Sequence, residues 1–336
     1  MSQPDPAFIT IQTGVDEVKS LLDSLFTGPR RELRRWSEIT GQTAQVRIAY
    51  PGQHLASMVT GVKGAGTAAR GMDLRDGSEV KSCSRADQLG ECRSDGCDSA
   101  VLPWETECPQ CGGTDIRRKV DSHWIIAVTS EQELAQYLAG PRLVLILFDR
   151  PEDSQTAVRV RAWEVWTQED RHSYFSWFLT DYFLNNYAKK IEAGRKPAPC
   201  NLHPLKQDFY MMNPVLVFEA LILDADTTAA TTDIVFHFDP KGDRAALIPE
   251  AMPASSVVPR AKLIALASAA PAGLVAPCVG LTEANVLEMR TTGDGIAEIV
   301  QRMTHLDESL RILIPRPEKR IKLTPSTYVR RGSGAP

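Results

Sequence analysis

The chain has 336 residues, of which 43% are hydrophobic and 24% charged, and its formal net charge at pH 7 is −4. This length permits one large domain or two ordinary ones, each with a full core. No apolar run of about eighteen residues occurs, and residues 1–14 lack a basic segment followed by an apolar one. We therefore expect a cytoplasmic protein, neither exported nor inserted in a membrane. The net charge is not typical of a nucleic-acid-binding protein, but "PRRELRRW" at 29–36 is a local basic patch.

The first part of the chain is predicted to be helical. Apolar residues recur at helical intervals in "VDEVKSLLDSLF" (15–26), and "RRELRRWSEITGQTAQVRIAY" (30–50) continues as a helix with a basic face. The sequence "PGQ" at 51–53 is predicted to interrupt the helices, and "HLASMVTGVKG" (54–64) to form another short one. Gly and Ala residues then indicate a loop over residues 61–71.

The stretch "RGMDLRDGSEVKSC", residues 70–83, predicts a hairpin. If residues 75–77 form a three-residue turn with the glycine in the left-handed conformation, Asp73 pairs with Glu79 across the two arms. Lys81 lies two residues further along the strand and shares their face. A two-residue turn would instead place Asp73 and Glu79 on opposite faces.

The two opposed carboxylates indicate a cation site. Like charges directly opposite each other destabilise a strand pair unless they are solvated or neutralised. Because Mg²⁺ prefers carboxylate oxygen, we expect Asp73 and Glu79 to hold it, with the carbonyl oxygen of Val80 as a third ligand. Metal-activated water attacks phosphorus, and Lys81 would orient that water and offset the developing charge, which suits phosphodiester hydrolysis. The alternative is a polar hairpin tip with an exposed ion pair.

Seven cysteines in a cytoplasmic chain are more typical of metal ligands or buried thiols than of disulfides. The sequences "ECRSDGC" and "ECPQCGG" form two knuckles that would wrap one tetrahedral Zn²⁺. Pro109 and the Gly112–Gly113 pair let the backbone curl round the metal. Four thiolates leave no open position for water, so the zinc is predicted to be structural. Its predicted ligands are Cys92, Cys97, Cys108 and Cys111.

Beyond the cysteines, three apolar runs rich in β-formers predict, together with the hairpin, a sheet of about five strands. These runs are "HWIIAV" (123–128), "RLVLILFD" (142–149) and "VRVRAWEVW" (158–166). A long aromatic helix is predicted over 169–194. After Asp224 the composition shifts to Ala, Thr and Pro, which indicates a second lobe. Its predicted elements are two strand-like runs (233–238 and 262–267) and a helix (295–306).

The hairpin sequence "GMDLRDGSEVKS" resembles the PD-(D/E)xK nuclease motif, in which an Asp and a Glu-x-Lys on neighbouring strands hold the metal. The matching residues here are Asp73 and the tripeptide 79–81. The longer run 50–92, with the two cysteine knuckles and "DSHWIIAV" after it, is similar to type II restriction endonucleases of the MamI-like group. Because the gap after Asp73 is short for this motif, Glu38 on the preceding helix is a further acid that could complete or replace part of the metal shell.

The resemblance implies Mg²⁺-dependent cleavage of a short, symmetric sequence in double-stranded DNA by a homodimer. It also implies a cognate DNA methyltransferase that protects the host's own sites. Some residues suit phosphate or base contacts by their chemistry, although a solvated helix face is the alternative for the first three. They are Gln42, Gln45 and Arg47 after the basic helix, and Arg316, Lys319, Arg320 and Lys322 in the basic tail. His123 and His203 could meet DNA, or simply be polar residues at strand ends.

The predicted fold is therefore α/β, with a PD-(D/E)xK restriction-endonuclease-like core, an inserted zinc ribbon and a C-terminal lobe. Helices and the catalytic hairpin are assigned to 1–90, the ribbon to 91–119, the rest of the core to 120–225 and the lobe with its basic tail to 226–336. The predicted function is site-specific hydrolysis of duplex DNA. The alternatives are a sequence-nonspecific repair or junction nuclease of the same superfamily, and a non-catalytic zinc-ribbon DNA-binding protein.

Overall fold

A computed structural model describes residues 3–12, 14–66, 72–152, 154, 156–168 and 173–314 of the protein. The chain divides into two compact units. The first consists of Met1–Ile126, Gln136–Ser173 and Asn201–Met252, and the second of Ala127–Ala135, Tyr174–Cys200 and Pro253–Pro336. Among the helices of the described residues, none has the length and apolar character needed to cross a membrane.

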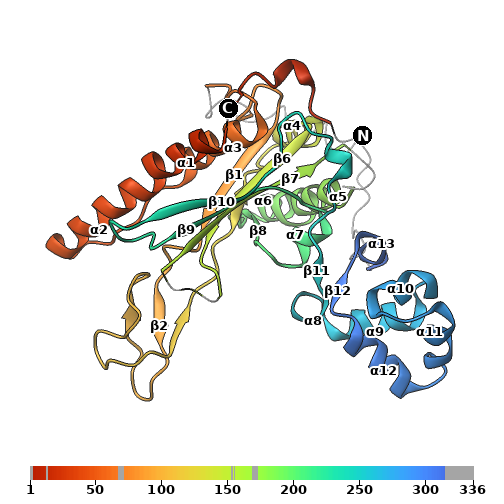
Figure 1. The fold of residues 1–336 in the computed structure, drawn as a ribbon. Coiled ribbons are helices and arrows are strands. Elements are labelled where there is room, and N and C mark those ends of the chain that lie inside the picture. Colours follow the sequence, from red (N-terminus) through yellow and green to blue (C-terminus); the bar gives the residue numbers. More distant parts are fainter. Residues whose placement is uncertain are drawn as a thin grey trace. The chain divides into compact units, whose positions relative to one another are not determined.

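The first unit is built on a five-stranded mixed sheet in the order β1-β6-β7-β9-β10 (Figure 1). Strand β1 runs parallel to β6, and the other neighbours are antiparallel. Every residue of β6 is buried, as expected for an apolar strand covered on both faces. The predicted sheet of about five strands is confirmed, but of its predicted members only the second hairpin arm and the runs 142–149 and 158–166 belong to it, while the run 123–128 pairs with Cys200–Leu202 instead. Its strands are β1 (Glu79–Ser84), β6 (Arg142–Asp149), β7 (Val158–Trp166), β9 (Val215–Leu223) and β10 (Thr231–His237).

Helices pack against one face of this sheet, which we call the helix-covered face. Helix α1 (Val15–Leu22) continues through a π-helical stretch (Asp23–Thr27) into α2 (Gly28–Thr40), and α3 (Ala49–Thr60) follows. Buried residues of α1 and α3 share one hydrophobic core with β1, β6 and β7. A Cβ at Gly52 of α3 would collide with Ser82 of β1, so the glycine permits the helix to approach the strand closely. This contact fixes α3 beside the hairpin.

Short elements complete the first unit. The cysteine module contains an antiparallel sheet of β3 (Ala100–Val101), β2 (Gly90–Cys92) and β4 (Ile116–Arg118). Strand β5 (Trp124–Ile126) pairs with β8 (Cys200–Leu202). The remaining elements are 3₁₀ turns η1 (Pro6–Phe8) and η5 (Arg244–Ala246), helix α7 (Gln207–Met211), and the C-terminal half of α4 (Glu131–Ala139).

The second unit is mainly helical. Helix α5 (Ser173–Tyr182) continues through a π-helical stretch (Phe183–Ala188) into α6 (Lys189–Glu192), which confirms the long aromatic helix over its described residues. The C-terminal helices are α8 (Ala254–Val257), α9 (Arg260–Ala269), α10 (Ala272–Val279), α11 (Glu283–Met289), α12 (Gly293–Arg302) and α13 (Glu308–Arg311). Two short strands pair with each other: β11 (Met252–Pro253) precedes α8, and β12 (His305–Leu306) lies between α12 and α13.

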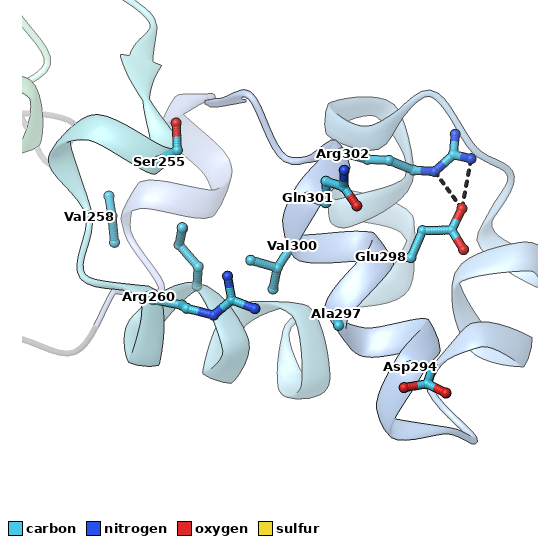
Figure 2. A pocket seen from close by; sticks show the side chains of 10 residues that line it. Ser255, Val258, Arg260, Asp294, Ala297, Glu298, Val300, Gln301 and Arg302 are labelled. Carbon is cyan, nitrogen blue, oxygen red and sulfur yellow. Dashed lines mark hydrogen bonds and ion pairs between the residues drawn. The ribbon is translucent and has the colours of Figure 1, made fainter.

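Helices α9 and α12 border a groove of about 1060 Å³ in this second unit (Figure 2). Arg302 and Glu298 point toward each other at its rim, with 2.7 Å between Nη2 and Oε1. None of the residues that line the groove is a site residue predicted from the sequence.

Two predictions for the N-terminal helices are wrong. The helix predicted over 30–50 ends at Thr40, because Gly41 adopts a left-handed φ of 69° and closes it with an N–H to Ser37 carbonyl bond. Pro51 does not interrupt a helix but lies in the first turn of α3, where a backbone N–H has no intrahelical partner to lose.

Two predictions for the C-terminal part are also wrong. The strand-like run 233–238 does form a strand, but as β10 it belongs to the five-stranded sheet and not to a second lobe. The run 262–267 lies in helix α9. The unit that contains the sheet therefore continues to Met252, beyond the predicted boundary at residue 225.

Candidate active site

The hairpin turn has the geometry predicted from its glycine. Gly77 has a φ of 85°, and the N–H of Leu74 donates to the carbonyl of Ser78 at 3.0 Å, so residues 75–77 form a three-residue turn. The carboxylate of Asp76 accepts from the N–H of Ser78 at 3.0 Å, which stabilises the turn from its own side chain. The three-residue turn is confirmed.

The first arm of the hairpin, however, is not a regular strand. Leu74 forms only an isolated bridge with Gly64, and the N–H of Ala65 donates to the carbonyl of Asp73 at 2.9 Å. The predicted ladder pairing of Asp73 with Glu79 is therefore wrong. Instead the Asp73 side chain reaches the strand itself, where its Oδ2 accepts from the N–H of Val80 at 2.9 Å.

The carboxylate of Asp73 is partly buried and lies near the negative charge of Glu79. Burial raises its pKa most, and the neighbouring charge of Glu79 raises it further, to about 6. Hydrogen bonds from Val80 and Gln53 and the charge of Lys81 oppose this shift. The ionised form of Asp73 is therefore disfavoured beside Glu79. Such a pair of neighbouring acids is typical of a site that binds a cation.

Glu79 and Lys81 project from β1 on the side opposite the helix-covered face, since Val80 between them packs in the core. Their side chains form an ion pair with 2.5 Å between Nζ and Oε1. The hydroxyl of Tyr137 on α4 donates to the same Glu79 oxygen at 3.3 Å. Burial opposes the charge of Lys81, but Glu79 and Tyr137 raise its pKa, so the ammonium stays charged.

The carbonyl of Val80 lies on the same edge of β1 as Asp73. In a strand, the N–H and C=O of one residue point to the same side of the chain. Because the N–H of Val80 is directed at Asp73, its carbonyl faces the same edge of β1. Three oxygen donors, from Asp73, Glu79 and Val80, are thus compatible with a hard divalent cation.

Two residues at this site were missed from the sequence. Gln53 of α3 donates its side-chain N–H to Asp73 Oδ1 at 2.6 Å, and Tyr137 contacts Glu79 from 58 residues further along the chain. The signal for Gln53 is Pro51, which fits the first turn of a helix and so places Gln53 one turn inside α3. No local sequence signal marks Tyr137.

A buried arginine anchors the turn to the sheet. Arg142, at the start of β6, donates from Nη2 to Asp76 at 3.0 Å and from Nε to Ser78 at 3.1 Å. Its Nη1 lies 2.7 Å from Glu164 Oε1 on β7, and Arg244 donates from Nε to the same carboxylate at 3.3 Å. Burial opposes ionisation of Glu164, but the two guanidinium groups lower its pKa. The turn is therefore tied to the centre of the sheet by paired, buried charges.

The structure does not bring Glu38 into contact with this group. Glu38 is exposed on α2 and pairs with Arg34, with 3.3 Å between Nε and Oε1. It borders a shallow depression with Trp104 and Glu105 of the cysteine module. Its role in the metal shell stays a prediction.

The predicted DNA contacts are located as follows. Gln42, Gln45 and Arg47 are exposed in the non-helical segment 41–48 between α2 and α3. Their role in DNA binding stays a prediction. The basic tail residues Arg316, Lys319, Arg320 and Lys322 lie outside the described residues.

The four predicted zinc ligands come together. Their sulfur atoms all lie within 4.8 Å of one another, with 3.6 Å between Cys92 and Cys111 and 3.7 Å between Cys97 and Cys108. Four sulfurs at about 2.3 Å from a tetrahedral zinc would be about 3.8 Å apart, so the geometry fits Zn²⁺. A Cβ at Gly113 would collide with Ser94, which explains the glycine in the second knuckle.

The raised pKa of Asp73 predicts how stability depends on pH. The ordinary value is 3.8 and the folded-state value about 6, so ionised Asp73 destabilises the metal-free fold, fully above about pH 6 and not at all below about pH 4. In EDTA, Asp73→Asn should therefore melt at a higher temperature than the wild type at pH 8, with a difference that shrinks toward pH 4.

The exposed Asp233 of β10 provides the control. Asp233→Asn should show no comparable gain at pH 8. A wild type more stable than Asp73→Asn at pH 8, or a difference that does not change with pH, would refute the electrostatic assignment.

Comparison with known proteins agrees with this geometry. The family model "MamI restriction endonuclease" matches residues 35–255, more than half of the chain. The type II restriction enzyme MamI of Microbacterium ammoniaphilum is 32% identical over 176 residues, 51% of each chain, so the protein spans about half the length of this curated relative. No solved structure matches the chain. The match over 35–255 includes the hairpin, the cysteine module and the five-stranded sheet, and the chain belongs to the MamI restriction endonuclease family.

Proposed function

We propose that this protein is a Mg²⁺-dependent type II restriction endonuclease that hydrolyses double-stranded DNA at a specific sequence. The observation that carries the proposal is the cluster of Asp73, Glu79 and Lys81 around one edge of β1, in a chain of the MamI family. Like the curated relative, it would act on DNA as a restriction enzyme. Cleavage of both strands of a symmetric site would need a homodimer, and a cognate methyltransferase would protect the host's DNA.

The residues of this site would have the following roles. Asp73, Glu79 and the Val80 carbonyl would hold Mg²⁺, and Gln53 would orient Asp73 by the hydrogen bond to Oδ1. When bound, Mg²⁺ supplies Lewis-acid activation of water and of the phosphodiester. Lys81 would orient the attacking water and stabilise the negative charge that develops on phosphorus oxygens.

In the metal-free site Lys81 already neutralises Glu79. If Glu79 holds the metal, its ion pair with Lys81 would be weakened and the Lys81 ammonium would be released to face the substrate. Tyr137, whose ring centroid lies 5.8 Å from Nζ, would limit how far the released side chain can move. This arrangement supports a role of Lys81 in orienting the attacking water as well as in stabilising charge.

We also propose that the cysteine module is a zinc ribbon with a structural Zn²⁺. The support is the close approach of four sulfurs, held by two glycine-containing knuckles. The ribbon would be inserted in the nuclease core between β1 and β5. Its side chain Trp104 lies under the guanidinium of Arg34, 5.6 Å from the ring centroid, so the ribbon is packed against α2.

Loss of either charged residue of the Glu-x-Lys motif should abolish cleavage without loss of DNA binding. Glu79→Gln and Lys81→Met should each lower the cleavage rate by about 100-fold or more, because these groups act on the transition state. The measurement is digestion of a large plasmid with Mg²⁺, alongside binding to the same DNA in EDTA. Glu288→Gln on α11, an exposed position, provides the control and should cleave normally.

The digestion pattern also separates the candidate functions. Discrete fragments from the wild type support a restriction enzyme, and a smear supports a nonspecific nuclease. An intact plasmid supports a non-catalytic DNA-binding protein. A Glu79→Gln or Lys81→Met variant that cleaves near the wild-type rate would overturn the catalytic assignment.

Removal of one zinc ligand should destabilise the module. Cys108→Ser should lower the zinc content of purified protein from one equivalent and lower the melting temperature, because binding free energy at such a site is folding free energy. Elemental analysis and thermal melts measure both effects. Cys278→Ser, outside the module, is the matched control and should keep its zinc. A wild type purified without zinc would contradict the ribbon.

A further inference from the structure

A line of side chains continues from the catalytic pair along β1. Glu79, Lys81 and Cys83 alternate with the core-facing Val80, so they share the face of the sheet opposite the helix-covered one. Arg85 follows directly after β1, which ends at Ser84. The charge of Arg85 acts on Cys83 and the charge of Asp149 acts on both, so all three lie close together, with Cys83 and Asp149 buried.

Arg85 is fixed in place by its neighbours. Its backbone N–H donates to the carbonyl of Phe148 at 2.7 Å, and its Nη2 donates to the carbonyl of Pro204 at 2.8 Å. The nearby carboxylate of Asp149 is already paired with Arg161, whose Nη2 lies 2.8 Å from Oδ2. Arg85 is thus oriented by carbonyl groups, while its closest acid is neutralised by another arginine.

His203 lies near Arg85, and the charges of His123 and Lys206 also act on it. The rings of His123 and His203 are 5.0 Å apart, and the side chains of His203 and Lys206 are exposed. Between the latter two, Leu205 has a φ of 58°, a left-handed conformation that a residue with a Cβ rarely adopts. Strained backbone of this kind persists where the surrounding structure fixes it, and it often lies at a binding site.

The electrostatics of this group favour an anion. Burial lowers the pKa of His203 most, and the charges of His123, Arg85 and Lys206 lower it further, against the opposing charge of Asp208. Asp121 also lies near Arg85, but its carboxylate accepts a hydrogen bond from Gln88. A bound anion would be attracted by the positive charges of Arg85 and Lys206.

We infer that Arg85, His123, His203 and Lys206 form a phosphate-binding subsite for the DNA backbone. The inference rests on the proposed function for its ligand. Lys81 and Arg85 are four residues apart in sequence, so their Cα atoms are separated by at most about 14 Å. The subsite would therefore contact a backbone phosphate near the cleaved bond and hold the DNA in line with the catalytic group.

The test is the salt dependence of DNA binding. The full chain is titrated with a short duplex of arbitrary sequence in EDTA, from about 50 to about 200 mM salt. Because each phosphate contact contributes about 0.9 to the slope of log K against log salt, Arg85→Gln and Lys206→Gln should each weaken binding and flatten the slope by up to that amount. Arg85→Lys keeps the charge and should retain most of the slope.

The control is Lys241→Gln. Lys241 is exposed and follows Pro240, which packs near Gly61 at the end of α3, on the helix-covered side. It should leave the slope unchanged. Slopes for Arg85→Gln and Lys206→Gln equal to that of the wild type would overturn the subsite. If Arg85→Gln proves unstable in thermal melts, the exposed Lys206→Gln decides the question.

This outcome is separate from that of the proposed function. Binding is measured without metal and does not require cleavage. A wild type that binds DNA but leaves it intact in Mg²⁺ overturns the nuclease and not the subsite. A wild type that cleaves DNA while the slopes are equal overturns the subsite alone, and a wild type that does not bind DNA overturns both.

Discussion

The interaction on which the site depends is the buried contact of Arg142 with Asp76, Ser78 and Glu164. A guanidinium and a carboxylate taken fully out of water are costly unless each is paired, and here each is paired more than once. The contact has only one good geometry, so it fixes the turn at residues 75–77 against β6 and β7. This contact therefore also fixes the positions of Asp73 and Glu79, which lie on either side of that turn.

Placing acids so close together has a cost in the metal-free protein, and the surrounding side chains reduce it. Lys81 neutralises Glu79, while Gln53 and the N–H of Val80 each donate to one oxygen of Asp73. These partners keep the group ordered in the absence of a metal ion. Under the proposed function, the same partners would become the ligand-orienting and catalytic groups once a cation is present.

The parts of this account that follow local rules could be predicted from the sequence. Gly77 specified its turn because only a glycine takes the left-handed conformation there without strain, and the cysteine spacing brought four sulfurs together. Alternating and apolar runs predicted three of the five strands, β1, β6 and β7, as part of the core, and β9 was not predicted. The fifth, β10, was assigned to the wrong domain because composition does not show which sheet a strand joins.

The contacts that could not be predicted are those made across long stretches of chain. Tyr137 and Arg142 reach the hairpin only because β6 lies beside β1. No local sequence pattern predicts that these two strands are neighbours. The predicted pairing of Asp73 fails for the same reason: the backbone of the arm before the turn bonds to residues 63–65, and only the Asp73 side chain bonds to β1. Both the long-range contacts with the hairpin and the pairing of Asp73 are determined by tertiary packing.

The central claim is that Asp73 and Glu79 share one divalent cation. It is tested most directly by titrating the zinc-loaded, DNA-free protein with Mn²⁺, a hard ion that takes the same oxygen ligands, and measuring free Mn²⁺ by electron paramagnetic resonance. The account predicts one oxygen-ligated site in the wild type, weakened at least about tenfold in both Asp73→Asn and Glu79→Gln. Wild-type affinity in either variant would contradict it.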